Sequence, residues 1–143
     1  MIVADASAIV ELLFRTDAGR AVETRLFRRG ETIHAPALVD LEVAQVLRRY
    51  VARKEMTPSR ALAAIEMMVR FPLERYTHDP LLPRIWELRD NLTAYDAAYV
   101  VLAEGLHAPL LTCDARLARA PGIRAVVELI DEQAGTAHND SGR

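Results

Sequence analysis

Four carboxylates in this sequence occupy positions where a strand ends or a helix begins, namely Asp5, Glu42, Asp96 and Asp114. Asp5 and Asp114 each directly follow a short apolar run with the length of a buried strand. Asp96 lies in the first turn of a predicted helix, and Glu42 lies near the start of a long one. Strand ends and the starts of the following helices share one edge of a parallel α/β sheet, so the four side chains can converge there.

Convergence of these acids would create a repulsion that stability alone gives no reason to assemble. Two like charges at ~4 Å repel by ~1 kcal/mol in water and by about 4 kcal/mol at an effective dielectric of 20. A divalent cation removes this repulsion. Oxygen-only ligands, without cysteine or paired histidine, suit Mg²⁺ or Mn²⁺ better than zinc. The pattern therefore favours a site for Mg²⁺ or Mn²⁺ at the sheet edge.

Each acid taken singly also has an ordinary structural role. Asp5 and Ser7 can both cap the first helix, and Ser7 is expected to keep that role if Asp5 binds metal. Asp96 ends a Thr-Ala-Tyr-Asp stretch that has the form of a capping box. Asp114 can cap the helix after it, and Glu42 suits the positive end of its helix dipole. Only the joint pattern favours a metal site.

The bulk composition limits the class of protein. The chain has 143 residues, 51% of them hydrophobic and 27% charged, with a formal net charge of -2, which predicts one globular domain. A single cysteine excludes an intramolecular disulfide and a thiolate metal cluster. No signal peptide is recognisable, and no apolar run approaches the roughly 20 residues that span a bilayer. We expect a cytoplasmic protein without a membrane partner.

Turn and cap residues divide the chain into alternating strands and helices. Strands are predicted at about residues 2–4, 31–35, 73–77, 109–113 and 123–129. Helices are predicted at about residues 8–14, 17–29, 38–54, 58–70, 80–90, 93–105 and 114–120. This alternation predicts a single-domain, three-layer α/β/α fold with a mostly parallel central sheet of four to five strands. The domain is expected to cover residues 1–132, and residues 133–143 are expected to form a flexible C-terminal tail.

Other chemistries lack their sequence signatures. The chain has no G-x-x-x-x-G-K-[ST] phosphate loop, no G-x-G-x-x-G dinucleotide loop and no G-x-S-x-G nucleophile elbow. Its histidines show no metal-ligand spacing and are expected at the surface or at strand ends; they are His34, His78, His107 and His138.

Four stretches of the chain together resemble the PIN-domain ribonucleases, and most of all the VapC-type toxins of bacterial toxin–antitoxin pairs. They are Val-Ala-Asp-Ala-Ser at 3–7, Leu-Glu-Val at 41–43, Leu-Thr-Ala-Tyr-Asp-Ala-Ala-Tyr at 92–99 and Leu-Thr-Cys-Asp-Ala-Arg-Leu at 111–117. The resemblance covers roughly residues 1–130, and the Thr-Ala-Tyr-Asp-Ala-Ala segment is its most specific part.

The resemblance implies a metal-dependent endoribonuclease. The four acids would hold one or two Mg²⁺ or Mn²⁺ ions, with Asp5 and Asp96 as direct ligands. Ser7 and Thr112 would be supporting polar groups. A metal-activated water would attack the phosphodiester in line and leave a 5′-phosphate and a 3′-hydroxyl.

Basic residues near these acids are candidate RNA contacts. Arg116 would lie within one turn of Asp114 and can meet a phosphate, although a solvated arginine explains it equally well. Arg48 and Arg49 belong to a cluster, with Arg53 and Lys54, at the end of a long predicted helix. The cluster suits a phosphate track, and compensation of the helix dipole explains it nearly as well.

By the same resemblance, the partners would be an RNA substrate, a VapB-like antitoxin that blocks the acidic site, and a second copy of the chain. One alternative is a PIN nuclease of RNA processing with no toxin role. A second is a phosphatase of the aspartyl-phosphate type, which is disfavoured because Ser7 stands where a second acid is needed. A third is a non-catalytic binding module, against which the presence of all four acids argues.

Overall fold

The computed structural model describes residues 1–131, so the predicted tail at 133–143 lies outside the described part of the chain. The strands are β1 (Ile2–Ala4), β2 (Ile33–Pro36), β3 (Leu73–Tyr76), β4 (Leu110–Thr112) and β5 (Val127–Leu129). The helices are α1 (Ala6–Phe14), α2 (Asp17–Leu26), α3 (Val39–Ala52), α4 (Pro58–Arg70), the 3₁₀ turn η1 (Asp79–Leu81), α5 (Leu82–Glu87), α6 (Ala94–Leu106) and α7 (Ala115–Ala118). Their order is the predicted alternation of strands and helices.

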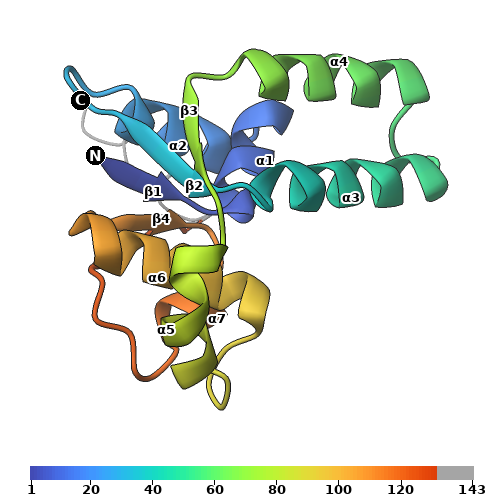
Figure 1. Cartoon of the computed structure of the whole chain (residues 1–143). Coiled ribbons are helices and arrows are strands. Elements are labelled where there is room, and N and C mark those ends of the chain that lie inside the picture. The colour runs from blue at the N-terminus through green and yellow to red at the C-terminus, as the bar shows by residue number, and fades with distance from the viewer. Residues whose placement is uncertain (132–143) are drawn as a thin grey trace, which may run out of the picture.

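The strands of the described chain form one five-stranded sheet in the order β3-β2-β1-β4-β5. Every neighbouring pair is parallel, so the predicted mostly parallel sheet is confirmed. The chain moves outward from β1 through β2 to β3, and then returns across α5 and α6 to place β4 on the other side of β1. This reversal leaves β1 at the centre of the sheet (Figure 1).

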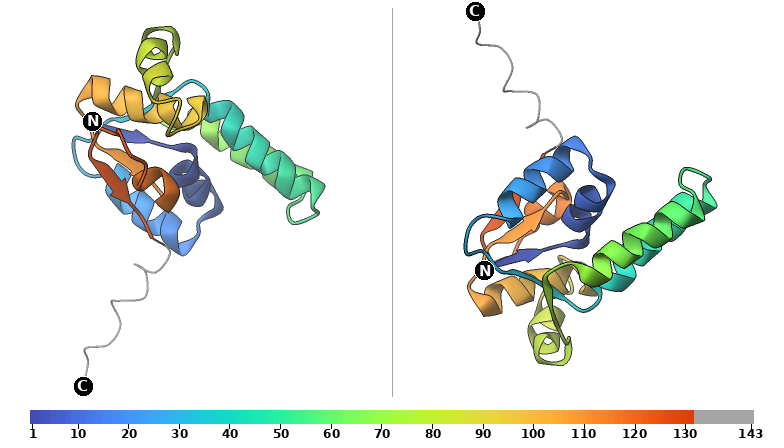
Figure 2. Two further views of the ribbon diagram at one scale, coloured as in Figure 1. Left: turned by 90° about the horizontal axis from the view of Figure 1, so that it is seen from below. Right: turned by 90° about the horizontal axis from the view of Figure 1, so that it is seen from above.

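Helices cover both faces of the sheet, as the prediction of three layers requires. Helix α6 lies against one face, and α1 with α2 lies against the other (Figures 1 and 2). The core strands are apolar and buried along their whole length: Ile2, Val3 and Ala4 in β1 are 0% exposed. Helix α6 is also buried along most of its length, from Ala97 to Ala103. Burial on this scale is the main source of stability in such a fold.

Polar caps set where most helices begin. Asp5, Thr16, Thr57, Thr93 and Asp114 are N-caps, and the side chain of each accepts a hydrogen bond from a backbone N–H in the first turn. Such a bond satisfies one of the donors that a helix start leaves without an internal partner.

Several predicted element boundaries were wrong. Helix α2 ends at Leu26 rather than near residue 29, and the helix predicted at 80–90 is the short pair η1 and α5. Gly105, predicted as the stop of its helix, lies inside α6, and His107 ends that helix in the left-handed conformation with φ 49°. The last strand occupies only Val127–Leu129 of the predicted 123–129.

His34 was expected at the surface or at a strand end, and that expectation was wrong. It lies in β2 and is only 3% exposed. Its ring nitrogens are hydrogen-bonded to the hydroxyls of Thr32 and Tyr76, each at 2.8 Å, and these bonds make the burial possible.

The pair α3 and α4 extends from the carboxyl end of the sheet as a helical hairpin (Figure 1). Leu47, Met56, Ala64 and Met68 of this hairpin are buried, while Leu62 and Val69 remain exposed. No helix of the described chain has the length and apolar character needed to cross a membrane.

Candidate functional site

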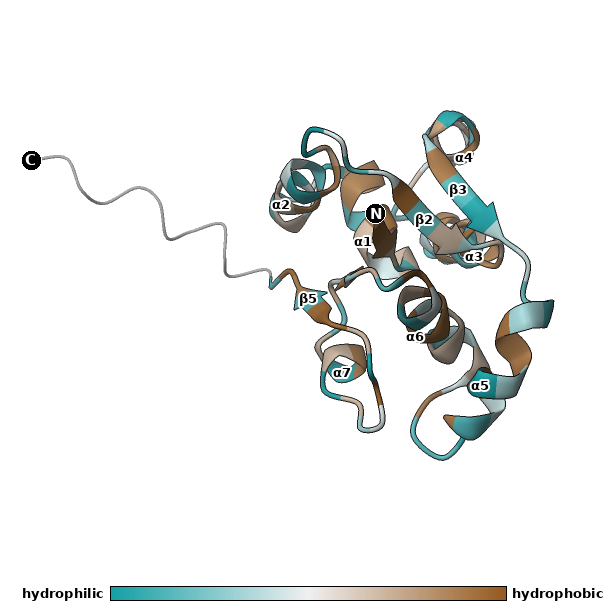
Figure 3. Cartoon of the chain, turned by 60° about the vertical axis from the view of Figure 1, so that its left-hand side comes forward, coloured by the Kyte–Doolittle hydropathy of each residue, from teal (hydrophilic) through white to brown (hydrophobic). Residues whose placement is uncertain are grey.

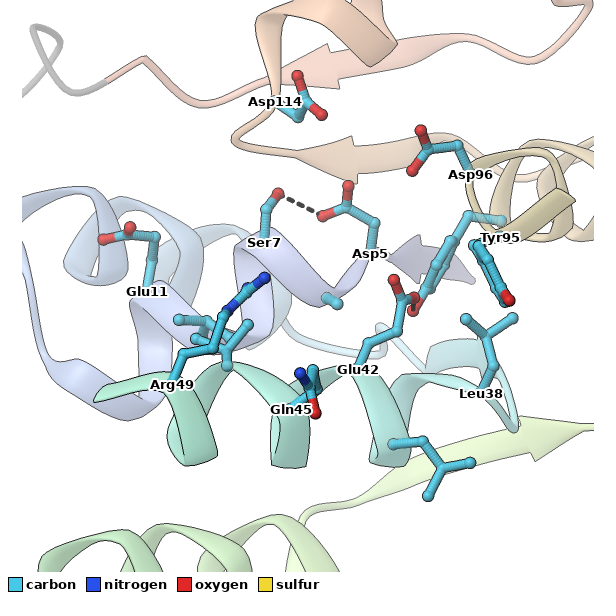
Figure 4. Close-up of a pocket in the computed structure, with 15 residues that line it drawn as sticks. Asp5, Ser7, Glu11, Leu38, Glu42, Gln45, Arg49, Tyr95, Asp96 and Asp114 are labelled. Carbon is cyan, nitrogen blue, oxygen red and sulfur yellow. Dashed lines mark hydrogen bonds between the residues drawn. The ribbon is translucent and has the colours of Figure 1, made fainter. Parts of the chain in front are cut away.

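The four predicted acids lie around one cleft at the carboxyl ends of β1 and β4. The strands that follow β1 in the chain are first added on one side of it (β2, β3) and then on the other (β4, β5), so the order reverses between β1 and β4. Open α/β sheets bind their ligands at such a switch point. The cleft has a volume of about 670 Å³, and its walls come from α1, α3, α6 and the turn after β4. Glu42, Asp96 and Asp114 surround Asp5 in this cleft (Figure 4).

Asp5 is the most buried of the four acids, with 5% of its surface exposed. Its Oδ1 accepts hydrogen bonds from Ser7 Oγ at 2.6 Å and from the Ala8 amide at 3.1 Å, and its Oδ2 accepts one from Thr112 Oγ1 at 2.7 Å. Burial raises the pKa of this carboxyl, although the three hydrogen bonds act in the opposite direction. All three of these hydrogen-bond partners are uncharged groups.

Ser7 and Thr112 join the ends of the two central strands. Ser7 Oγ accepts a hydrogen bond from the Cys113 amide at 2.9 Å and lies 3.3 Å from Thr112 Oγ1. Thr112 is fully buried at the end of β4, and its hydroxyl accepts a bond from the Asp114 amide at 2.9 Å. The expectation that Ser7 caps the first helix was wrong, because Asp5 is the N-cap of α1 and Ser7 supports it.

Glu42 enters the cleft from the first turn of α3. Its Oε1 accepts a 2.6 Å hydrogen bond from the hydroxyl of Tyr99, a residue of α6 that is only 2% exposed. Burial is the main cause of a raised pKa for Glu42; the Tyr99 bond opposes it, and the charges of Asp96 and Asp5 add to it. The same surroundings raise the pKa of the Tyr99 phenol well above its ordinary value, so it remains a hydrogen-bond donor.

Arg116 links the two remaining acids. Its Nη2 lies 3.1 Å from Asp96 Oδ2 and 3.3 Å from Asp114 Oδ2. Asp114 also caps α7 through bonds from the Arg116 and Leu117 amides to its Oδ1. The Arg116 side chain is 75% exposed, so this bridge lies at the mouth of the site and is open to solvent.

One face of α3 supplies a further wall of the cleft. Glu42, Gln45 and Arg49 are spaced three and four residues apart, which places them on the same side of a helix. Figure 4 shows the Arg49 side chain directed toward Ser7 and the acids. Arg48, predicted with Arg49 as an RNA contact, is exposed on α3 but does not line the cleft.

The donor atoms of this site fit a hard divalent cation. They are carboxylate oxygens supported by hydroxyls, which is the chemistry that Mg²⁺ and Mn²⁺ prefer. In residues 1–131, however, no three His, Cys, Asp or Glu side chains are gathered into a preformed metal shell. Arg116 already provides positive charge to Asp96 and Asp114, while Asp5 and Glu42 have only neutral hydrogen-bond partners. Asp5 and Glu42 are therefore the acids that most lack a counter-charge.

Sequence reasoning missed several residues that line the cleft. Tyr99 lies one helical turn after Asp96, and Gln45 one turn after Glu42, so helical spacing from the predicted acids was the signal that could have identified both. Tyr95, beside Asp96, is 66% exposed and lines the same cleft. Glu11 of α1 also lines it.

Comparison with known proteins identifies the family of this chain. Residues 2–123 match the family described as PIN domain. The chain is 46% identical over 130 residues to ribonuclease VapC12 of Mycobacterium tuberculosis, covering 91% of this chain and 99% of that protein. It is 41% identical over 129 residues to ribonuclease VapC1 of the same organism, covering 90% of this chain and 96% of that protein.

A solved structure shows the same fold. The chain resembles VapBC2 from Rickettsia felis, solved bound to a DNA fragment from their promoter, with a TM-score of 0.63 and 16% identity. The match covers 92% of this chain and all of that one. With a family match across most of the chain and relatives above 40% identity, the protein belongs to the PIN-domain family and, within it, to the VapC ribonucleases.

Proposed function

We propose that this protein is an endoribonuclease that depends on Mg²⁺ or Mn²⁺ and acts as the toxin of a toxin–antitoxin pair. The observation that carries the proposal is the group of four carboxylates around one cleft at the sheet's switch point, with Asp5 almost fully buried. Its relatives VapC12 and VapC1 are named ribonucleases, which supports RNA as the substrate.

Asp5 and Asp96 would hold the cation, with Glu42 and Asp114 binding it directly or through water. A bound divalent cation lowers the pKa of a water molecule and neutralises charge that develops on a phosphate. Ser7 and Thr112 hold both oxygens of Asp5 in a fixed orientation, and Tyr99 does the same for one oxygen of Glu42. These hydrogen bonds keep the ligand atoms directed into the cleft before substrate arrives.

Arg49 and Arg116 are the arginines best placed to meet the RNA backbone. Arg49 lines the cleft from α3, and Arg116 lies on the opposite side next to Asp96 and Asp114. Each can donate to phosphate oxygens in the bidentate manner of a guanidinium. Arg48 would contribute only long-range attraction, because it is exposed on α3 and does not line the cleft.

A small antitoxin that covers the acidic cleft would be the physiological regulator, and the active toxin would be a homodimer in the cytoplasm. The likeness to VapBC2 supports a toxin–antitoxin partnership of this kind. Exposed apolar side chains at the mouth of the cleft, Leu41 at 76% and Tyr95 at 66%, give such a partner a surface to bury.

The test is cleavage of structured RNA by the purified protein in the presence of Mg²⁺ or Mn²⁺. Asp5→Asn and Asp96→Asn should each abolish cleavage, because each removes one ligand charge with little change in shape. Asp17→Asn is the matched control: this acid is exposed on α2 and pairs only with Arg20. Circular dichroism would establish that all three variants are folded. Parent-like cleavage by both Asp5→Asn and Asp96→Asn would overturn the assignment of the site.

Toxicity requires a separate measurement. Induced expression of the parent should arrest bacterial growth, and Asp5→Asn should not. If the parent cleaves RNA without slowing growth, the protein is an RNA-processing nuclease of the same family.

A further inference from the structure

A second, smaller hollow lies beside the acidic cleft. It has a volume of about 390 Å³ and is formed by the turn between α5 and α6 together with α7. Its polar lining comes from Arg89, Asn91, Thr93, Asp96 and Arg116, among others. Asp96 lines both this hollow and the acidic cleft, so the two are contiguous across the start of α6.

An exposed tryptophan contacts one of the arginines that line this hollow. Trp86, the only tryptophan of the chain, is 68% exposed on α5. The guanidinium carbon of Arg89 lies 5.0 Å from the centre of the Trp86 ring, and Arg89 Nη1 donates a 2.9 Å hydrogen bond to the Trp86 carbonyl. Arg89 is thus held between the ring and the hollow. Figure 3 shows α5 and α7 next to α6 at the same end of the molecule.

The side chains of this hollow match an unpaired nucleotide. Nucleobases stack on aromatic rings and on arginine planes, and Trp86 with Arg89 presents both. Asn91 and Thr93 offer an amide and a hydroxyl to a base edge or a ribose. Arg89 and Arg116 both line the hollow and supply charge for the flanking phosphates. Asp90 and Asp96 lie there too, so the net field is small and stacking has to provide much of the binding.

We propose that the hollow lined by Arg89 and Arg116, together with the Trp86 ring beside Arg89, binds an unpaired nucleotide of the RNA next to the bond that is cut. The inference rests on the proposed ribonuclease function. A strand whose scissile phosphate lies at the four acids would pass Arg116 and then reach Arg89 and Trp86, because Asp96 lines both cavities and Arg116, which lines the hollow, pairs with Asp96. The cut would then require at least one unstacked base on that side.

The sole tryptophan gives a direct readout of this contact. A short single-stranded oligouridylate should quench the fluorescence of Trp86 when added to the Asp5→Asn variant, which keeps RNA intact. Trp86→Ala and Arg89→Ala should each weaken binding of the labelled oligouridylate about tenfold, which is a typical loss for one stacking partner. Trp86→Phe should recover most of the affinity, because it retains a ring. Annealing the oligouridylate to oligoadenylate should abolish the quench.

Kinetics in the otherwise unaltered protein separate this inference from the proposed function. Trp86→Ala and Arg89→Ala should raise KM for single-stranded RNA about tenfold and leave kcat near the parent value. Arg60→Ala is the control for the loss of one arginine charge. Arg60 is exposed at the start of α4, far from both cavities, so this variant should leave KM unchanged. If the parent does not cut RNA at all, the proposed function fails. The nucleotide subsite is refuted if the parent cuts RNA, both Trp86→Ala and Arg89→Ala keep the parent's KM, and the oligouridylate leaves Trp86 fluorescence unchanged.

Discussion

The hydroxyl of Tyr99 donates a 2.6 Å hydrogen bond to Oε1 of Glu42, and this bond connects the buried helix α6 with the face of α3 that lines the cleft. Tyr99 is fixed by the core, since only 2% of its surface is exposed. Glu42 belongs to the first turn of a helix that extends beyond the sheet as a hairpin. The bond therefore positions a carboxylate of the extended hairpin relative to the rigid centre of the fold.

Tyr99→Phe should separate the positioning of Glu42 from its charge. Loss of a hydrogen bond to a carboxylate should lower the free energy of unfolding by about 1–3 kcal/mol. Cleavage should fall about 10- to 100-fold, as is typical when a partner that orients a metal ligand is removed. Urea unfolding and RNA cleavage at saturating Mn²⁺ measure the two effects. Tyr50→Phe is the control, because Tyr50 is not among the residues that line the cleft and its ring packs edge-to-face on Phe14; an equal loss in both variants would contradict the positioning role.

Arg116 is the local counter-charge of Asp96 and Asp114, and its removal should favour a divalent cation. Arg116→Gln should bind Mn²⁺ about two- to fivefold more tightly than the parent, because the two acids lose an exposed ion-pair partner of modest strength. Isothermal titration calorimetry without RNA measures this. Arg119→Gln, an exposed arginine just after the same short helix, removes the same charge and should change the affinity less. Weaker Mn²⁺ binding by Arg116→Gln than by Arg119→Gln would show that Arg116 supports the metal site instead.

The sequence predicts the sheet edge of this protein well because local chemistry decides it. Short apolar runs followed by Asp5 and Asp114 predict buried strands whose ends carry caps, and the structure has both. Thr57 followed by proline predicts the start of α4 equally well. These features depend on residues close to one another in the chain, so pattern and spacing are enough to find them.

Features that depend on distant residues could not be predicted in the same way. The strand order that places β4 next to β1 is set by tertiary packing, and the contact of Ser7 with Thr112 follows from it. His34 is buried only because Tyr76 supplies a partner from β3. Gly105 is a different case: the helix continues through it and ends at His107, which adopts the left-handed conformation that glycine was expected to provide.

The contribution of Asp5 to the stability of the metal-free protein should decrease as pH rises. Burial raises the pKa of Asp5 above 3.8 in the folded state, so the native carboxyl keeps its proton at pH values where the unfolded one has lost it. The contribution of Asp5 to the unfolding free energy therefore falls from about pH 4 upward and levels off above the native pKa. Asp5→Asn lacks this titration, so the stability of the parent relative to the variant should fall over the same range. Urea titrations with a chelator at several pH values measure it; a relative stability that grows with pH would mean that the charged form of Asp5 is the favoured one.

Binding of Mn²⁺ should reverse that trend. The ion binds the deprotonated carboxylates, so its affinity should increase with pH, and binding should release protons. Added Mn²⁺ should therefore raise the unfolding midpoint of the parent more at neutral than at acidic pH, and raise that of Asp5→Asn much less.

Gly19 should be indispensable for the close packing of α2 on the end of α1. A Cβ at this position would lie 2.1 Å from the carbonyl oxygen of Glu11, a backbone atom that cannot move without shifting α1. Gly19→Ala should therefore lower the free energy of unfolding by about 1–3 kcal/mol or more. Because Glu11 lines the acidic cleft, RNA cleavage should fall as well.

Gly105→Ala is the control for Gly19→Ala, because it makes the same substitution at a position with free space around it. Gly105 lies within α6, and a Cβ there would meet no atom within 4 Å. Alanine has the higher helix propensity, so this variant should be more stable than the parent by about 0.5–1 kcal/mol. Urea unfolding measured on both variants tests the pair. If Gly19→Ala is as stable as the parent, the approach of α2 to the Glu11 carbonyl is looser than the structure shows, and the cleft wall formed by α1 does not depend on it.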